Sequence, residues 1–183
     1  MVIYMRIISG KHRSRVIKMV GIDTTRETTD KVRGAIFNLI SFQRPEGIVL
    51  DLFSGSGAMG LEALSRGYEF AYFNDINKKA YQTTKDNINA LGYEKKSIIT
   101  NSDYKRALLS YTKKFNIVFL DPPYKLDCCN EIISYIDDNN LLEDDGLIVC
   151  EVDLNTNIFE TNNFEIIKER EYGIRKVYVL KRR

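Results

Sequence analysis

The chain has 183 residues, of which 44% are hydrophobic, and a formal net charge of +2, so we expect one compact domain over residues 1–183 and no overall attraction to a polyanion. The opening Met1-Val2-Ile3-Tyr4 is too short for a signal peptide and no apolar run approaches the length of a membrane span, which predicts a cytoplasmic protein without a membrane partner. Cys128, Cys129 and Cys150 form neither a plausible disulfide framework nor a zinc site, and no metal is expected.

A basic β-hairpin is predicted over residues 5–20. Met5 to Ser9 and Arg15 to Met19 flank a turn with Gly10, and we expect its tip to extend beyond the main sheet. The cations between residues 6 and 18, with no acid among them, are Arg6, Lys11, Arg13, Arg15 and Lys18. Such a patch attracts phosphates and favours RNA contact, although a solvated hairpin is the alternative. His12, the one histidine, is expected to be a further polar contact because it cannot form a catalytic triad alone.

A helix is predicted from Thr28 to Ser41. Its apolar face is formed by Val32, Ile36, Leu39 and Ile40. Thr28 or Thr29 can cap the first amides, and Arg33 can contact a phosphate or the target base.

A strand, a glycine loop and a helix follow in residues 48–64. The glycines Gly55, Gly57 and Gly60 match the dinucleotide fingerprint, which alone is a weak signal. Asp51 discriminates between ligands, because it would repel a pyrophosphate but attract the α-amino group of S-adenosylmethionine. We therefore assign to that cofactor Asp51, Phe53, Ser54, Gly55 and Gly57.

The next two strands also end in acids. Residues 69–73 lead to Asp75, which suits a ribose diol, with Ile76 beside it; alternatively Asp75 only caps the helix predicted over 77–91. Residues 97–101 lead to Ser102 and Asp103, where a carboxylate can accept a hydrogen bond from the adenine amine.

A buried strand over residues 116–120 runs into Asp121-Pro122-Pro123-Tyr124. The two prolines lack backbone donors and stiffen the loop, which leaves the Asp121 carboxylate and the Pro122 carbonyl as acceptors. We expect these acceptors to bind the amine hydrogens of a planar group such as a nucleobase, while Tyr124 stacks on the ring of that group. An ordinary Pro-Pro turn is the alternative interpretation of this loop.

These segments, in this order, resemble the RsmD-type 16S rRNA guanine-N2 methyltransferases, within the class I S-adenosylmethionine-dependent superfamily. The resemblance rests on residues 5–10, 26–38, 51–67 and 121–124. Two residues depart from the family pattern: Glu27 stands where proline is usual, and Asn74 where an apolar residue is usual.

The resemblance implies an α/β fold, with a Rossmann-like sheet of seven strands, the last antiparallel, and helices on both faces. It implies that Ile174 to Leu180 is the antiparallel edge. It also implies that the mouth of the cofactor and substrate cleft is lined by Thr28, Thr29, Asp30 and Arg33. It further implies S-adenosylmethionine as cofactor and a guanine of 16S rRNA as target, within a small ribosomal subunit or its assembly intermediate. Nothing in the sequence demands more than a monomer.

Other functions stay open at this point. A DNA adenine-N6 or protein glutamine methyltransferase can present the same loop at residues 121–124. A nicotinamide-dependent dehydrogenase would use the glycine loop and Asp75 but leave Asp51 without a role. A non-catalytic RNA-binding module would explain the hairpin alone.

Overall fold

The computed structural model describes residues 5–21, 29–123 and 126–183. The predictions made for Tyr124, for Thr28 and for the opening residues 1–4 lie outside these ranges.

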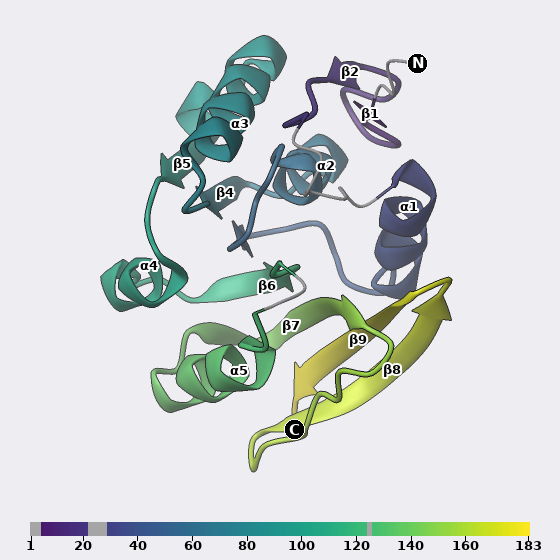
Figure 1. Cartoon of the computed structure of the whole chain (residues 1–183), viewed down its shortest axis with the longest axis vertical. Coiled ribbons are helices and arrows are strands. Elements are labelled where there is room, and N and C mark those ends of the chain that lie inside the picture. The colour runs from purple at the N-terminus through teal and green to yellow at the C-terminus, as the bar shows by residue number, and fades with distance from the viewer. Residues whose placement is uncertain (1–4, 22–28, 124–125) are drawn as a thin grey trace.

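Within the described residues, seven strands form one twisted sheet in the order β5-β4-β3-β6-β7-β9-β8 (Figure 1). The five strands from β5 to β7 are parallel, and β9 is antiparallel to both of its neighbours. Their bounds are β3 Ile48–Asp51, β4 Phe70–Asn74, β5 Ser97–Thr100, β6 Phe115–Leu120, β7 Leu142–Asp153, β8 Phe164–Tyr172 and β9 Arg175–Arg182. The predicted fold class is confirmed, with one correction: the last strand lies inside the sheet, and β8 forms the edge.

Helices cover both faces of the sheet. On one face lie α1 (Asp30–Leu39), α2 (Ala58–Arg66) and α3 (Lys78–Leu91), and on the other α4 (Tyr104–Ser110) and α5 (Cys129–Asp138). A short 3-10 turn, η1 (Glu94–Lys96), precedes β5. None of the helices that the structure describes is long and apolar enough to cross a membrane.

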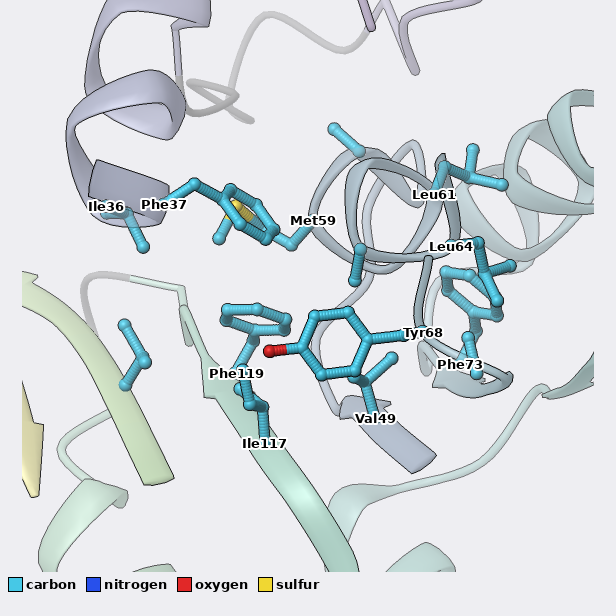
Figure 2. Close-up of a cluster of buried hydrophobic side chains, with 14 of the residues drawn as sticks. Ile36, Phe37, Val49, Met59, Leu61, Leu64, Tyr68, Phe73, Ile117 and Phe119 are labelled. Carbon is cyan, nitrogen blue, oxygen red and sulfur yellow. The ribbon is translucent and has the colours of Figure 1, made fainter. Parts of the chain in front are cut away.

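The strands alternate between two buried clusters, because successive side chains of a strand point to opposite faces. In β6, Ile117 and Phe119 face α1 and α2, while Val118 and Leu120 face α4 and α5. Figure 2 shows the first cluster, where Phe37 of α1 lies against Phe119 with ring centroids 5.7 Å apart. A central sheet that is apolar on both sides gives the near-continuous hydrophobic runs seen in the sequence.

Helix α1 begins later than predicted, and its buried face includes the predicted Ile36 and Ile40 together with Arg33 and Phe37. Thr29 is its N-cap and accepts from the Val32 amide, as the sequence suggested for that residue. The buried positions are Arg33, Ile36 and Phe37 in the helix and Ile40 just after it, whereas the predicted Val32 and Leu39 are only partly buried.

The N-terminal hairpin has two short strands, β1 (Met5–Arg6) and β2 (Val16–Ile17), which pair antiparallel as a separate sheet. It lies outside the main sheet, as predicted, and it is held by contacts with the helices. The Lys11 amide donates to the Ser65 carbonyl at 2.7 Å, and Lys18 pairs through its backbone with the Asn87 side chain. The hairpin is therefore docked on α2 and α3, as Figure 1 shows.

Candidate active site

The five parallel strands that the structure describes have their carboxyl ends at one edge of the sheet. Asp51 ends β3, and it is aligned with Phe73 of β4 and Phe119 of β6. Asp75 and Asp121 follow these neighbours by two residues, so the three acids belong to adjacent strand ends. In open α/β sheets this edge, where the chain order reverses, is where ligands bind.

The loop after β3 has the backbone geometry that brings a ligand close. Gly55 has φ +55°, and a Cβ built on it would meet nothing within 4 Å. Gly57 has φ +80° and a built Cβ would lie 2.8 Å from a Thr84 methyl carbon. Both residues have a positive φ, which glycine adopts without strain. The first glycine faces open space, and at the second a side chain would also collide with Thr84.

Asp51 is a buried carboxylate at the end of β3, where it contacts the first turn of α2. It is 4% exposed and accepts the Gly60 amide hydrogen at 3.0 Å. Burial raises the pKa of Asp51 to about 7, the Gly60 hydrogen bond opposes that rise, and the charge of Asp75 adds to it. The carboxyl group is thus poised to ionise near neutral pH, and a cationic ligand would favour its charged form.

Asp75 is held against the glycine loop. One of its oxygens accepts from the Gly55 amide at 2.9 Å and the other from the Asn77 amide at 2.8 Å. Burial raises its pKa, and these two hydrogen bonds oppose the rise. The cap of α3 is Asn77, which accepts from Lys79 and Ala80. Capping therefore does not explain Asp75, whose oxygens retain lone pairs for further donors.

Asn74 is a site residue whose role the sequence interpretation missed. It is 1% exposed, and its amide nitrogen donates to the Leu52 and Ser102 carbonyls at 3.3 and 3.0 Å. Its oxygen accepts from the Thr100 hydroxyl at 2.8 Å. The amide joins the loops after three strands, and its departure from the family pattern was the available signal.

The remaining predicted cofactor residues have local partners in the described structure. Asp103 is the exposed N-cap of α4 and accepts from the Lys105 amide, while Ser102 donates its hydroxyl to the Asp103 carbonyl. Phe53 packs on Tyr104 with ring centroids 5.7 Å apart. Ile76 is 68% exposed beside Asp75, an open position for a large apolar side chain. Ser54 lies 3.4 Å from the Thr84 hydroxyl.

The loop after β6 is stiff and partly open. Pro122 is buried, Pro123 is exposed, and the Pro123 carbonyl accepts from the Leu126 amide at 2.8 Å. The Asp121 side chain is half-buried, with its oxygen 3.8 Å from a guanidinium nitrogen of Arg175. In the described part of the chain, no group of His, Cys, Asp and Glu side chains is arranged to hold a metal ion.

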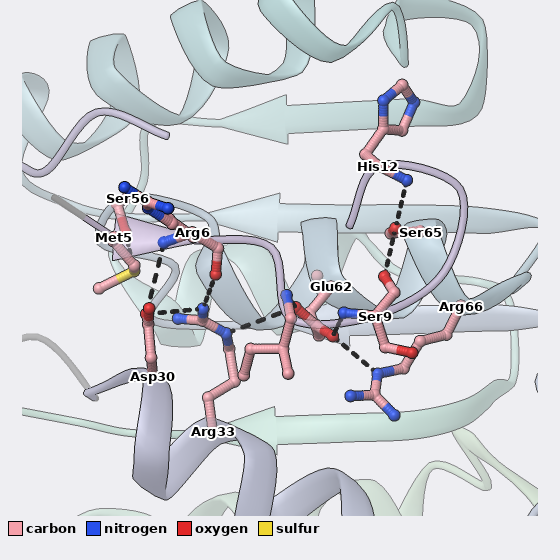
Figure 3. Close-up of polar contacts among 12 residues, drawn as sticks. Met5, Arg6, Ser9, His12, Asp30, Arg33, Ser56, Glu62, Ser65 and Arg66 are labelled. Carbon is pink, nitrogen blue, oxygen red and sulfur yellow. Dashed lines mark hydrogen bonds and ion pairs between the residues drawn. The ribbon is translucent and has the colours of Figure 1, made fainter. Parts of the chain in front are cut away.

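Arg33 lies in a buried polar network, as Figure 3 shows. Its side chain is 0% exposed and donates to the Arg6 carbonyl. It also donates to the Asp30 carboxylate at 2.9 Å, and its Nε lies 3.6 Å from a Glu62 oxygen. Glu62 also accepts from the Ile8 amide. The predicted contact of Arg33 with a phosphate or base does not fit this burial; the residue instead fastens the hairpin to α1 and α2.

The hairpin cations form an exposed patch beside this network. Arg6, Lys11, Arg13 and Arg15 are exposed, and Lys18 pairs with Asp86 at 2.8 Å while remaining 69% exposed. His12 packs edge-on against Tyr93 with ring centroids 5.0 Å apart. Its pKa is lowered by partial burial and by the charges of Lys11 and Arg15, so the ring is neutral at pH 7. The packing of the His12 ring against Tyr93 does not favour the RNA contact predicted for this residue.

Residues 5–181 match the family model described as "Conserved hypothetical protein 95". The chain is similar to "Putative rRNA methyltransferase YlbH" of Bacillus subtilis, with 42% identity over 98% of this chain and 100% of that protein. It is 30% identical to "Ribosomal RNA small subunit methyltransferase D" of Haemophilus influenzae over 93% and 90% of the two chains. A solved structure described as a putative methyltransferase of Escherichia coli has a TM-score of 0.87 at 30% identity and covers 98% of each chain.

Proposed function

The chain belongs to the RsmD-type rRNA methyltransferase family, and from that premise we propose that it transfers a methyl group from S-adenosylmethionine to the N2 amine of a guanine in 16S rRNA. One observation carries the proposal: Asp51 and the Asp121 loop end neighbouring parallel strands, with Asp51 in register with Phe119. The residues proposed to bind the cofactor and those proposed to bind the acceptor amine therefore lie at one edge of the sheet.

The residues around the glycine loop fit S-adenosylmethionine by their chemistry. Asp51 can attract the α-amino group, Asp75 can accept from the ribose hydroxyls, and the open space above Gly55 admits the ligand. When bound, the cofactor supplies an activated methyl group on a sulfonium. The protein then has only to position the acceptor, which is the main source of rate in such a step.

The loop after β6, residues 121–124, is proposed to bind the amine of the target base. A guanine N2 lone pair is delocalised into the ring, so the nitrogen has to be drawn towards sp3 geometry before it can attack. The Asp121 carboxylate and Pro122 carbonyl accept hydrogen bonds from the two amine hydrogens, and Tyr124 stacks on the flipped base. As the nitrogen bonds to the methyl carbon, the carbon–sulfur bond would break with its electron pair left on a neutral thioether, and the Asp121 carboxylate would take the proton that the amine loses. Stacking returns roughly 1–3 kcal/mol, which offsets the few kcal/mol needed to flip the base.

The basic hairpin favours a nucleic acid over a protein as substrate, and the family assignment favours rRNA over DNA. Its exposed arginines and lysines lie on a platform fixed to α2 and α3, so phosphate contacts can orient the target nucleotide. A protein glutamine methyltransferase has no use for such a patch. The substrate is the rRNA of a small subunit or of its assembly intermediate, and the enzyme acts as a monomer.

Replacing Asp75 with alanine is expected to weaken S-adenosylmethionine binding by about 10- to 150-fold, the range for losing hydrogen bonds to a charged group. Turnover at saturating cofactor should change less, because the acceptor's grip is intact. Titration calorimetry measures the affinity, with Asp86→Ala on helix α3 as control. Unchanged affinity in the Asp75 variant would remove this residue from the cofactor site.

Cofactor affinity should depend on pH through Asp51. Its pKa is raised to about 7, so below that pH the carboxyl carries a proton that binding of an ammonium group must displace. Affinity is expected to fall about tenfold between pH 7.5 and pH 6. Calorimetry at both values tests this, and Asp51→Asn should show weaker binding with no such slope. A flat profile for the unaltered protein would contradict the role.

Tyr124 lies outside the described residues, and its stacking role is part of the proposal. Tyr124→Ala should reduce kcat/KM by about 5- to 150-fold, taking the 1–3 kcal/mol of base stacking as lost in the transition state. Tyr124→Phe keeps the ring and should retain most of the activity. Loss of activity in both variants alike would point to the hydroxyl instead of the ring.

The test of the proposed function is methyl transfer from labelled S-adenosylmethionine to separate pools of purified small ribosomal subunits, naked 16S rRNA, DNA and protein. Label in the rRNA of the subunits is expected. Label confined to DNA or protein would replace the proposal with one of the other amine methyltransferases, and oxidation or reduction of a nicotinamide with no transfer would indicate a dehydrogenase.

A further inference from the structure

One arginine on β9 lies among three carboxylates at the ends of β6 and β7. The Arg175 guanidinium is 3.8 Å from Asp121, 3.5 Å from Glu151 and 3.9 Å from Asp153. Arg175 is 9% exposed and Glu151 is 5% exposed. A charged group in such surroundings is stable only when opposite charges face it, so these four side chains form one unit.

The antiparallel strand explains how the arginine reaches this edge. Since β9 runs against β7, its first residue lies at the carboxyl end of the parallel strands, where Arg175 pairs with Asp153. Asp121 follows Leu120, which is in register with Cys150, so Asp121 and Glu151 are neighbours. Along β9, Arg175 shares its face with the core residues Val177 and Val179. A charge at an inward-facing position of an apolar strand marks a specific role.

The charges around Asp121 come from several elements. Glu151 and Asp153 of β7 carry negative charge on this side of the sheet, and Arg175 of β9 carries positive charge. The charge of Asp121 also contributes to the raised pKa of the Cys129 thiol of α5. Nearby carboxylates favour the protonated form of Asp121, and the guanidinium opposes them. Protonation would convert a pure acceptor into a group that also donates, and so weaken its grip on an amine.

We propose that Arg175 is a positioning residue for methyl transfer, which holds the Asp121 carboxylate ionised and turned towards the amine. This inference rests on the proposed function, because it takes Asp121 as the residue that binds the acceptor amine and Arg175 as the residue that positions Asp121. A planar guanidinium with several donors can contact carboxylates from two strands at once, which a single ammonium does less well. The β8–β9 hairpin thereby takes part in the active site.

The test compares three variants, using labelled S-adenosylmethionine and purified small ribosomal subunits. Arg175→Gln is expected to lower kcat by about 10²-fold, as for a misplaced reacting group, with cofactor affinity within about twofold of normal. The acid limb of its kcat profile should move up by about one pH unit. Arg175→Lys keeps the charge and should restore the limb, but only part of kcat. Lys176→Gln is the matched control, since Lys176 pairs with Glu169 and Glu171 from the opposite face of β9.

A second measurement needs no substrate. The Asp121 carboxyl carbon, followed by NMR, should titrate at higher pH in Arg175→Gln than in the unaltered protein. The inference is overturned if Arg175→Gln turns over at the normal rate, or if kcat falls while the acid limb and the Asp121 titration stay in place, which would mean a structural role only. An unaltered chain that transfers no methyl group overturns the proposed function and the positioning role of Arg175 with it.

Discussion

Replacing Asp121 with alanine is expected to lower kcat by about 10²- to 10³-fold, the cost of removing one preorganised polar group that acts on the reacting atoms. The amine hydrogens would lose one of two acceptors, and the nitrogen would stay conjugated with the ring. S-adenosylmethionine affinity should remain within about twofold, because Asp121 is proposed to hold the acceptor amine and not the cofactor. Turnover is measured by transfer of labelled methyl and affinity by calorimetry.

Two further variants make the Asp121 result specific. Asp121→Asn keeps an acceptor oxygen and should retain more activity than the alanine variant. Asp127→Ala removes an exposed acid from the same loop and should have no effect. A large loss of cofactor binding in Asp121→Ala would place this residue in the cofactor site and contradict its assignment to the acceptor amine.

Glu62→Ala should lower the free energy of unfolding by about 3–5 kcal/mol, the range for removing one partner of a buried ion pair. Glu62 is 0% exposed and accepts from the Ile8 and Ser9 amides at 2.7 and 3.0 Å. It also pairs with Arg66 at 2.8 Å and with Arg33 at 3.6 Å. Its loss leaves the Ile8 and Ser9 amides without their acceptor and removes one of the two carboxylates that face the buried Arg33 guanidinium. Urea unfolding followed by circular dichroism measures the change.

The matched control is Glu131→Ala, which removes a surface ion pair with Lys105 of 2.7 Å. Since both side chains are more than half exposed, the loss should be below about 1 kcal/mol. Limited proteolysis should also cut the hairpin sooner in Glu62→Ala, because Glu62 fastens Ile8 and Ser9. Equal stability of the two variants would show that the network is not what holds the hairpin.

The strand ends could be predicted because each apolar run stops at an acid or a glycine loop. The sequence placed β3, β4, β5 and β6 within a few residues of their observed bounds, and α3 within one. The position of β9 was wrong, because an alternating pattern predicts a strand but not its neighbours. No element was assigned in advance to α4, α5, β7 or β8, which follow less distinctive patterns.

The buried polar contacts could not be predicted from local pattern. A charged residue at the start of a helix usually faces water, yet Arg33 is buried because Glu62 lies opposite it, 29 residues further along the chain. The docking of the hairpin depends on contacts such as Ile8 with Glu62, which are 54 residues apart. Glu62 and Arg175 did leave a signal, since each is a charge inside an otherwise apolar pattern.

We expect the loop after β6 to present the N2 amine of a guanine to S-adenosylmethionine bound beside it. Nucleoside mass spectrometry of 16S rRNA, after small subunits react with the protein and S-adenosylmethionine, identifies the methylated atom. One new N2-methylguanosine is expected, and Asp121→Ala should reduce its yield by about 10²- to 10³-fold. A methyl group found on adenine N6, on a ring nitrogen or on ribose, or no new nucleoside at all, would contradict this expectation.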